Sequence, residues 1–152
     1  MSRLSNNTAL NYLALATGSS LPAQVTKKSI TFADAAGQGQ VGAVAIATVT
    51  GAVEMMIIPY CTVNLVSAGG GTLVLGTAAT TNVFIASTTA TDIDAGEFWL
   101  SNAPAAAVDI STVKKWTVAA NVIATVGTGT ITAGTIDFYI HWRPISADGN
   151  VA

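Results

Sequence analysis

Residues 135–143, TIDFYIHWR, alternate between large apolar and mostly polar side chains. The even positions hold Ile136, Phe138, Ile140 and Trp142, and the odd positions hold threonine, aspartate, tyrosine, histidine and arginine. Successive side chains of a β-strand point to opposite faces, so this period of two predicts a strand with one face in a hydrophobic core. Pro144 cannot donate a ladder hydrogen bond and marks where the strand ends or leaves the sheet.

A second alternating segment, residues 116–126, precedes this strand. Its apolar positions are Trp116, Val118, Ala120, Val122, Ala124 and Val126. Because a glycine turn at residues 127–129 separates the two segments, we predict a long β-hairpin. Ile131 and Ile136 have opposite parity, which predicts a β-bulge at Gly134 that restores the core face.

The rest of the chain also divides into short strands and turns. We predict further strands at residues 29–33, 41–49, 53–66, 72–75, 82–87, 98–100 and 107–110. Valine and threonine are abundant in them, and branching at Cβ favours a pleated strand. The pattern predicts an all-β fold, an antiparallel β-sandwich of the jelly-roll type, with an immunoglobulin-like sandwich as the alternative.

The N-terminal region differs from this pattern. Residues 1–28 show neither strand nor helix periodicity over a sustained length, apart from a candidate short helix at residues 7–16. We predict an N-terminal arm at 1–28, extended or with a short helix, and a β-sandwich domain at 29–152. The arm either folds against a partner or is a disordered terminus.

Composition excludes some classes of function. Charged residues make up only 9% of the chain and hydrophobic residues 51%, against about 25% charged in an average soluble domain. Much of the surface is therefore small and neutral, or other protein chains cover it. The net charge of −2 argues against a nucleic-acid partner, and no apolar stretch approaches the roughly 18 residues that span a membrane.

Residues 55–58 are apolar at four consecutive positions, unlike a strand with one solvent-facing side. Both faces of this strand should be covered, which suggests contact with another subunit. We predict a subunit interface formed by Met55, Met56, Ile57 and Ile58. Pro59, next along the strand, predicts an edge position or a bend.

We find no catalytic, cofactor-binding or metal-binding motif and predict a protein that is not an enzyme. Cys61, the only cysteine, lies in an apolar run and is expected to be a buried, inert thiol in a protein made in a reducing cytoplasm. His141 falls on the polar face of its strand, without a motif that would supply a nucleophile.

Two charged clusters have alternative interpretations. The densest acidic cluster holds Asp92, Asp94 and Glu97, but it lacks the complete calcium-loop pattern. We interpret it as an acidic turn before the 98–100 strand, with a cation site as the alternative. The lysine pairs at 27–28 and 114–115 are solvated, or they meet an acidic partner surface.

Three segments carry a resemblance to a known family: ITFADAAGQGQVG, TTATDIDAGEFWL and ITAGTIDFYIHWRPISADGNV. Over about residues 29–151 the chain resembles small virion structural proteins of tailed bacteriophages. The resemblance implies a head decoration or cement protein with a jelly-roll-like sandwich, located on the capsid surface of the virion.

The resemblance further implies two partners, the major capsid protein and other copies of the chain in a homotrimer. We expect the N-terminal arm, residues 1–28, to contact the capsid through Arg3, Asn7, Leu10, Tyr12, Lys27 and Lys28. Two alternatives remain, a tail or spike component and a carbohydrate-binding module. The carbohydrate module would need exposed aromatic side chains, for which Trp99 and Tyr139 are the candidates.

Overall fold

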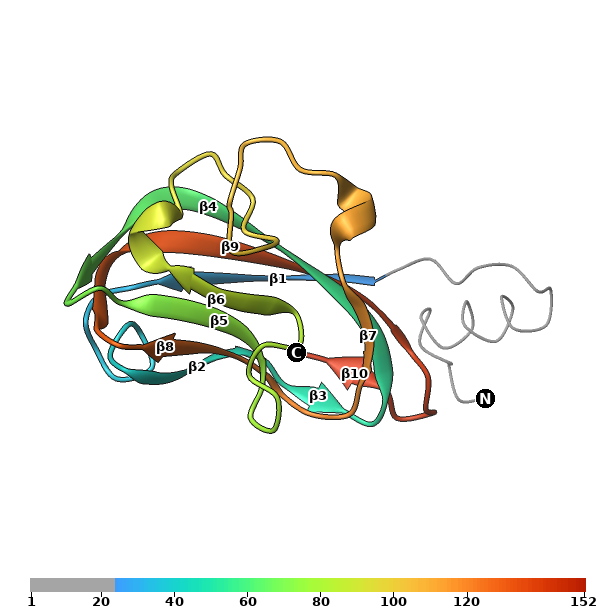
Figure 1. Ribbon diagram of the computed structural model, residues 1–152. Coiled ribbons are helices and arrows are strands. Elements are labelled where there is room, and N and C mark those ends of the chain that lie inside the picture. Colours follow the sequence, from blue (N-terminus) through green and yellow to red (C-terminus); the bar gives the residue numbers. More distant parts are fainter. Residues whose placement is uncertain (1–23) are drawn as a thin grey trace.

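The computed structural model describes residues 24–152, which form two antiparallel β-sheets packed against each other (Figure 1). The all-β sandwich prediction is confirmed. The elements are β1 (Gln24–Thr31), β2 (Gly42–Ala47), β3 (Val49–Thr50), β4 (Val53–Ala68), β5 (Thr72–Thr77), β6 (Ile85–Thr89), η1 (Ala90–Asp92), η2 (Ile110–Thr112), β7 (Lys115–Val118), β8 (Val122–Gly127), β9 (Thr130–Pro144) and β10 (Asn150–Val151).

The strand order identifies the topology. The first sheet has the order β1-β9-β4-β7 and the second has the order β2-β8-β5-β6, while β3 and β10 form a small pair of their own. Pairing is nested along the chain, because β1 pairs with β9, β2 with β8, β4 with β7 and β5 with β6. A long hairpin rolled into two layers has this pattern, which is that of a jelly roll.

The core lies between the two sheets and consists of the inward positions of each strand. In the first sheet, β9 contributes Ile136, Phe138 and Ile140, which are fully buried. In the second sheet, Val122 and Ala124 of β8 are buried to the same extent. The alternation in residues 135–143 therefore predicted the inward face of β9 correctly, and each large apolar side chain buried there contributes roughly 1.5–3 kcal/mol.

The predicted hairpin between residues 116–126 and 135–143 is wrong. The first segment contains two strands, β7 and β8, which belong to different sheets, and β8 pairs with β2 and β5 rather than with β9. The glycine turn at 127–129 crosses from the second sheet to the first. Thr128 has a φ of 66° there, and a side chain at Gly129 would collide with the carbonyl oxygen of Ala68.

The core face of β9 changes parity between Ile131 and Ile136, as predicted. Gly134 has a φ of 116° in this stretch, and the register between β4 and β9 shifts at several neighbouring positions. A side chain at Gly134 would lie 2.6 Å from the carbonyl oxygen of Asn64. Glycine therefore permits both the backbone angle and the close approach of β4.

Three further boundaries differ from the predictions. Residues 107–110 form no strand, and η2 begins at Ile110. Within 98–100, only Phe98 makes isolated bridges. Residues 24–28, which we had placed in the arm, belong to β1, because they pair in continuous register with β9.

Candidate interaction surface

The outer face of the first sheet carries most of the charged side chains of this sheet, together with several large ones. The register aligns them in rows across the strands, so that Val25, His141, Met56 and Lys115 form one row and Lys27, Tyr139 and Ile58 form the next. We call the outward-facing set the first-sheet surface; it consists of Val25, Lys27, Ser29, Glu54, Met56, Ile58, Tyr60, Lys115, Asp137, Tyr139, His141 and Arg143.

The predicted interface at residues 55–58 is divided between the two faces of β4. Met55 and Ile57 are 1% and 3% exposed and pack in the core of their own chain. They are therefore removed from the predicted interface, because a neighbouring subunit cannot reach them in the folded sandwich. Met56 and Ile58 are partly exposed on the first-sheet surface, where their interface role stays a prediction.

Pro59 lies where the sequence predicted an edge or a bend. It pairs with Phe138 of β9, while its carbonyl oxygen points away from β9 and accepts a hydrogen bond from the Trp99 amide at 3.0 Å. The nitrogen and the carbonyl of one strand residue point to the same side, so no ladder bond to β9 is lost at this proline. This part of β4 is an edge that the loop after β6 covers.

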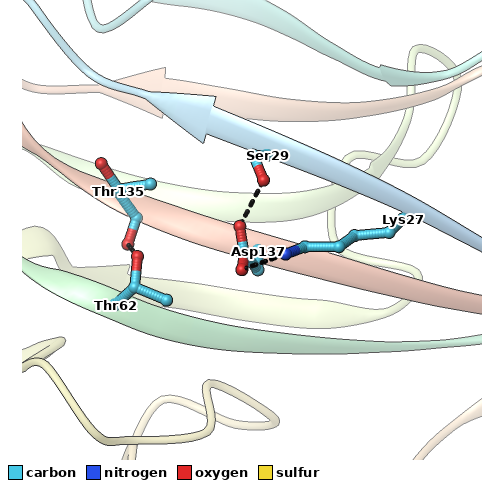
Figure 2. A network of polar contacts seen from close by, with 5 residues as sticks. All are labelled: Lys27, Ser29, Thr62, Thr135 and Asp137. Atoms are coloured by element: carbon cyan, nitrogen blue, oxygen red, sulfur yellow. Dashed lines mark hydrogen bonds and ion pairs between the residues drawn. The ribbon is translucent and has the colours of Figure 1, made fainter.

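A carboxylate at the centre of the first-sheet surface joins β1 to β9 (Figure 2). Asp137 forms an ion pair with Lys27, with 2.7 Å between Nζ and Oδ2, and accepts a short hydrogen bond from the hydroxyl of Ser29. Its side chain is only 12% exposed, whereas that of Lys27 is 49% exposed. The Lys27 ammonium also lies 5.5 Å from the centroid of the Tyr139 ring, within cation–π range.

The two hydrogen bonds to Asp137 lower the pKa of its carboxyl, with the bond from Lys27 as the larger cause. The same bond raises the pKa of the Lys27 ammonium. Lys27, predicted as a capsid contact, is therefore engaged within its own chain. The sequence signals an outward Asp137 by parity, but it does not show the register that brings Lys27 and Ser29 beside it.

A depression of about 330 Å³ lies at one end of the first-sheet surface, around Met56. It is lined by Glu54, Met55, Met56, Lys115, His141, Trp142 and Arg143. Arg143 donates to the Glu54 carboxylate at 2.5 Å, whereas within residues 24–152 Lys115 has no acidic partner. The depression therefore combines the partly exposed side chain of Met56 with an excess of positive charge.

The acidic cluster forms a turn that caps the free edge of β4. The amide of Cys61 donates to the Glu97 carbonyl at 2.8 Å, and the Gly96 amide donates back to Cys61 at 2.9 Å. The Asn64 side chain accepts from the Ala95 amide at 2.7 Å. In residues 24–152 we find no group of side chains suited to a metal ion, and the turn is held by backbone and side-chain hydrogen bonds.

Among residues 24–152, the remaining candidates are a buried cysteine, an outward-facing histidine and a buried tryptophan. Cys61 is buried, as predicted, and burial raises the pKa of its thiol to about 11, so the thiol form persists at neutral pH. His141 lies between Val25 and Met56 in its row on the first-sheet surface. Trp99 is fully buried and donates to Thr88 at 2.8 Å, which removes it as a sugar-stacking candidate.

Four of the predicted capsid contacts, Arg3, Asn7, Leu10 and Tyr12, lie outside the described residues. Lys28 is exposed on β1, and its register partner Phe138 shows that it belongs to the inward side of this edge strand. An inward-directed lysine at a sheet edge discourages the addition of another strand. No helix within residues 24–152 is both long and apolar enough to cross a membrane.

No protein-family model matches the sequence, and no curated protein gives a significant match. Among solved structures, the chain is similar to one from the acidic stable capsid structure of Helicobacter pylori bacteriophage KHP30. The TM-score is 0.46 and the sequence identity 15%, over 86% of this chain and 92% of that chain. A likeness of this degree does not by itself transfer a function.

Proposed function

We propose that this chain is a structural virion protein of a tailed bacteriophage, which associates with copies of itself and stabilises the capsid from its outer surface as a cement protein. The observation that carries the proposal is the first-sheet surface, where large side chains such as Met56, Ile58 and Tyr139 stand outward on a sheet whose other face is the core. The role is structural rather than catalytic.

The first-sheet surface is suited to a permanent contact because its strands are firmly fixed. β4 and β9 pair over almost their whole lengths, from Val53 opposite Pro144 to Ala68 opposite Thr130. β1 is fastened to β9 by the Lys27–Asp137 ion pair as well as by the ladder. A rigid surface loses little conformational entropy when it binds a partner.

The composition favours a protein that is covered by its neighbours. Only 9% of its residues are charged. Such a low charge content is closer to the composition of obligate interfaces, which are comparatively apolar, than to that of an ordinary solvent-exposed surface. The jelly roll also occurs in viral capsid proteins. The resemblance of residues 29–151 to phage virion proteins points in the same direction and makes the major capsid protein and a homotrimer the proposed partners.

Two measurements on the full chain test this function. The mass of the purified protein in solution should exceed that of the 15.3 kDa monomer, and the protein should co-sediment with heads that lack it. A variant without residues 2–23 keeps β1 complete and tests the arm separately. We expect it to remain an oligomer and to lose binding to heads; undiminished binding would contradict the role proposed for the arm.

Labelled particles distinguish the head from the tail. An antibody or gold label on this protein should decorate the capsid in electron micrographs of virions. A label confined to the tail would favour a tail or spike component. A protein that neither oligomerises nor co-sediments with any virion part would refute the structural proposal itself.

A further inference from the structure

We infer that the depression around Met56 receives the acidic turn of a second copy of this chain, formed by residues 92–97, so that subunits associate head to tail. The inference rests on the self-association proposed above and specifies the surfaces that carry it. The two surfaces are complementary in charge, and they occupy different parts of the same subunit.

The receiving surface has positive charge that no ion pair within residues 24–152 neutralises. Lys115 and Arg143 line the depression, and only Glu54 balances them, through its ion pair with Arg143. Met56 lies between Lys115 and His141 in the register of the sheet. A carboxylate entering the depression would meet the Lys115 ammonium and, beside it, the Met56 side chain.

The inserted surface has the opposite character. Asp92 and Asp94 are exposed, and within residues 24–152 neither they nor Glu97 form an ion pair. The turn is already in a fixed shape, because the Glu97 side chain accepts from the Asp94 amide at 3.2 Å and Asn64 holds Ala95. A turn ordered in the free subunit loses little entropy on binding.

The positions of the two surfaces require a head-to-tail contact. The depression surrounds Met56, whereas the turn is bonded to Cys61 and Leu65, farther along β4. At about 3.3 Å per residue, these points are roughly 15–30 Å apart on the strand. One subunit can therefore receive a turn and present its own simultaneously, and such contacts form a ring when the rotation between subunits closes.

Charge reversal tests the contact in the full-length protein. Lys115→Glu and Asp94→Lys should each weaken self-association by about tenfold or more, since like charges would then face each other. The double variant, Lys115→Glu with Asp94→Lys, should recover much of the wild-type association because the pair is restored with reversed signs. Sedimentation velocity over a concentration series measures the association constants of the wild type and of the three variants.

Lys114→Glu is the matched control. It makes the same change of charge at the neighbouring residue, which does not line the depression, and should leave association within about twofold of wild type. Unfolding curves identify any variant that fails to fold; for such a variant, the milder Lys115→Gln and Asp94→Asn substitutions should still weaken association.

The outcomes separate this contact from the wider function. If the wild type oligomerises and both single variants associate as strongly as it does, the proposed contact is overturned and the structural function stays in place. A monomeric wild type at every concentration would refute self-association itself. Loss of head binding by Lys115→Glu in a monomeric protein would instead assign the depression to an acidic segment of the capsid, against the second copy.

Discussion

The two sheets of the sandwich have similar inner faces but different outer faces. Inward positions of both are filled by large apolar groups, such as Phe138 in the first sheet and Leu75 in the second, each fully buried. The outer face of the first sheet carries both ion pairs found in residues 24–152. The outer face of the second sheet instead holds small or β-branched neutral residues: Ala43, Ala45, Val74, Ile123 and Thr125.

This difference separates the demands of the fold from those of a partner. A sandwich needs two apolar inner faces, and both sheets supply one. It does not need methionine, tyrosine, lysine and arginine gathered on one outer face, because the second sheet of the same sandwich has none of them on its outer face. Large side chains with fixed partners give direction and specificity to a contact, so we propose that the first-sheet surface is the one that faces a partner.

The largest expected effect tests the similarity of the inner faces. Phe138→Ala and Leu75→Ala should each reduce the free energy of unfolding by roughly 2–5 kcal/mol, because each leaves a cavity in the shared core. Urea unfolding measures both. We expect one cooperative transition for each variant, and a separate early transition in only one of them would show that the sheets do not share a core.

The next effect tests the difference between the outer faces. Met56→Glu places a charge on the first-sheet surface and should weaken self-association about tenfold or more. Ala45→Glu places the same charge on the exposed outer face of the second sheet and should change association by less than about twofold. Sedimentation velocity compares them, and equal effects at the two positions would remove the functional distinction between the sheets.

Within residues 135–143 the sequence predicted which side chains face the core, because alternation there reports directly on burial. In residues 116–126 the prediction was only partly right, since Trp116 was assigned to the core face but is 44% exposed. Ile136, Phe138 and Ile140 were assigned correctly, and so was the change of parity near Gly134. It did not predict which strands pair. Residues 116–126 alternate as one strand, yet Lys115–Val118 and Val122–Gly127 lie in different sheets, since a period of two is the same in either sheet.

The candidate surface was predicted less well for a related reason. Four consecutive apolar residues indicated two covered faces of β4, but only the fold shows that Met55 is inward and Met56 outward. The Asp137 network joins residues more than 100 positions apart in the chain. No local pattern contains that information, because the register of the first and last strands of a jelly roll is set by the whole topology.

A smaller effect concerns the carboxylate on the first-sheet surface. Asp137→Asn removes the ion pair with Lys27 while preserving a hydrogen-bonding side chain, and should lower the Tm by only about 2 °C at neutral pH, because Lys27 is half-exposed. Thermal unfolding from pH 2 to 11 measures the difference in Tm between the wild type and this variant. The substitution should lower the Tm more at neutral pH than at either extreme.

Both flanks of that pH profile follow from the ion pair. The pKa of the Asp137 carboxyl is lowered by folding, so its contribution is complete above about pH 5 and is lost as the pH falls through the folded-state pKa. The pKa of the Lys27 ammonium is raised by folding, so its contribution is complete below about pH 9 and is lost as the pH rises through the folded-state value. A wild-type advantage that stays constant with pH would show that the pair does not stabilise β1.

The smallest expected effect lies on the second sheet. The hydroxyl oxygen of Thr125 is buried without a hydrogen-bond partner among the described residues, and its register neighbours on the outer face are Ala43 and Val74. Thr125→Val replaces this hydroxyl by a methyl group of similar size and removes an unsatisfied polar group. We expect the free energy of unfolding to rise by about 0.5 kcal/mol or to stay unchanged.

Thr62 on the first sheet is the matched control, since its hydroxyl donates to the Thr135 carbonyl at 3.3 Å, and Thr62→Val should lower stability instead. If Thr125→Val lowers the free energy of unfolding as much as Thr62→Val does, the Thr125 hydroxyl must have a hydrogen-bond partner. The outer face of the second sheet would then satisfy its polar groups as fully as that of the first sheet.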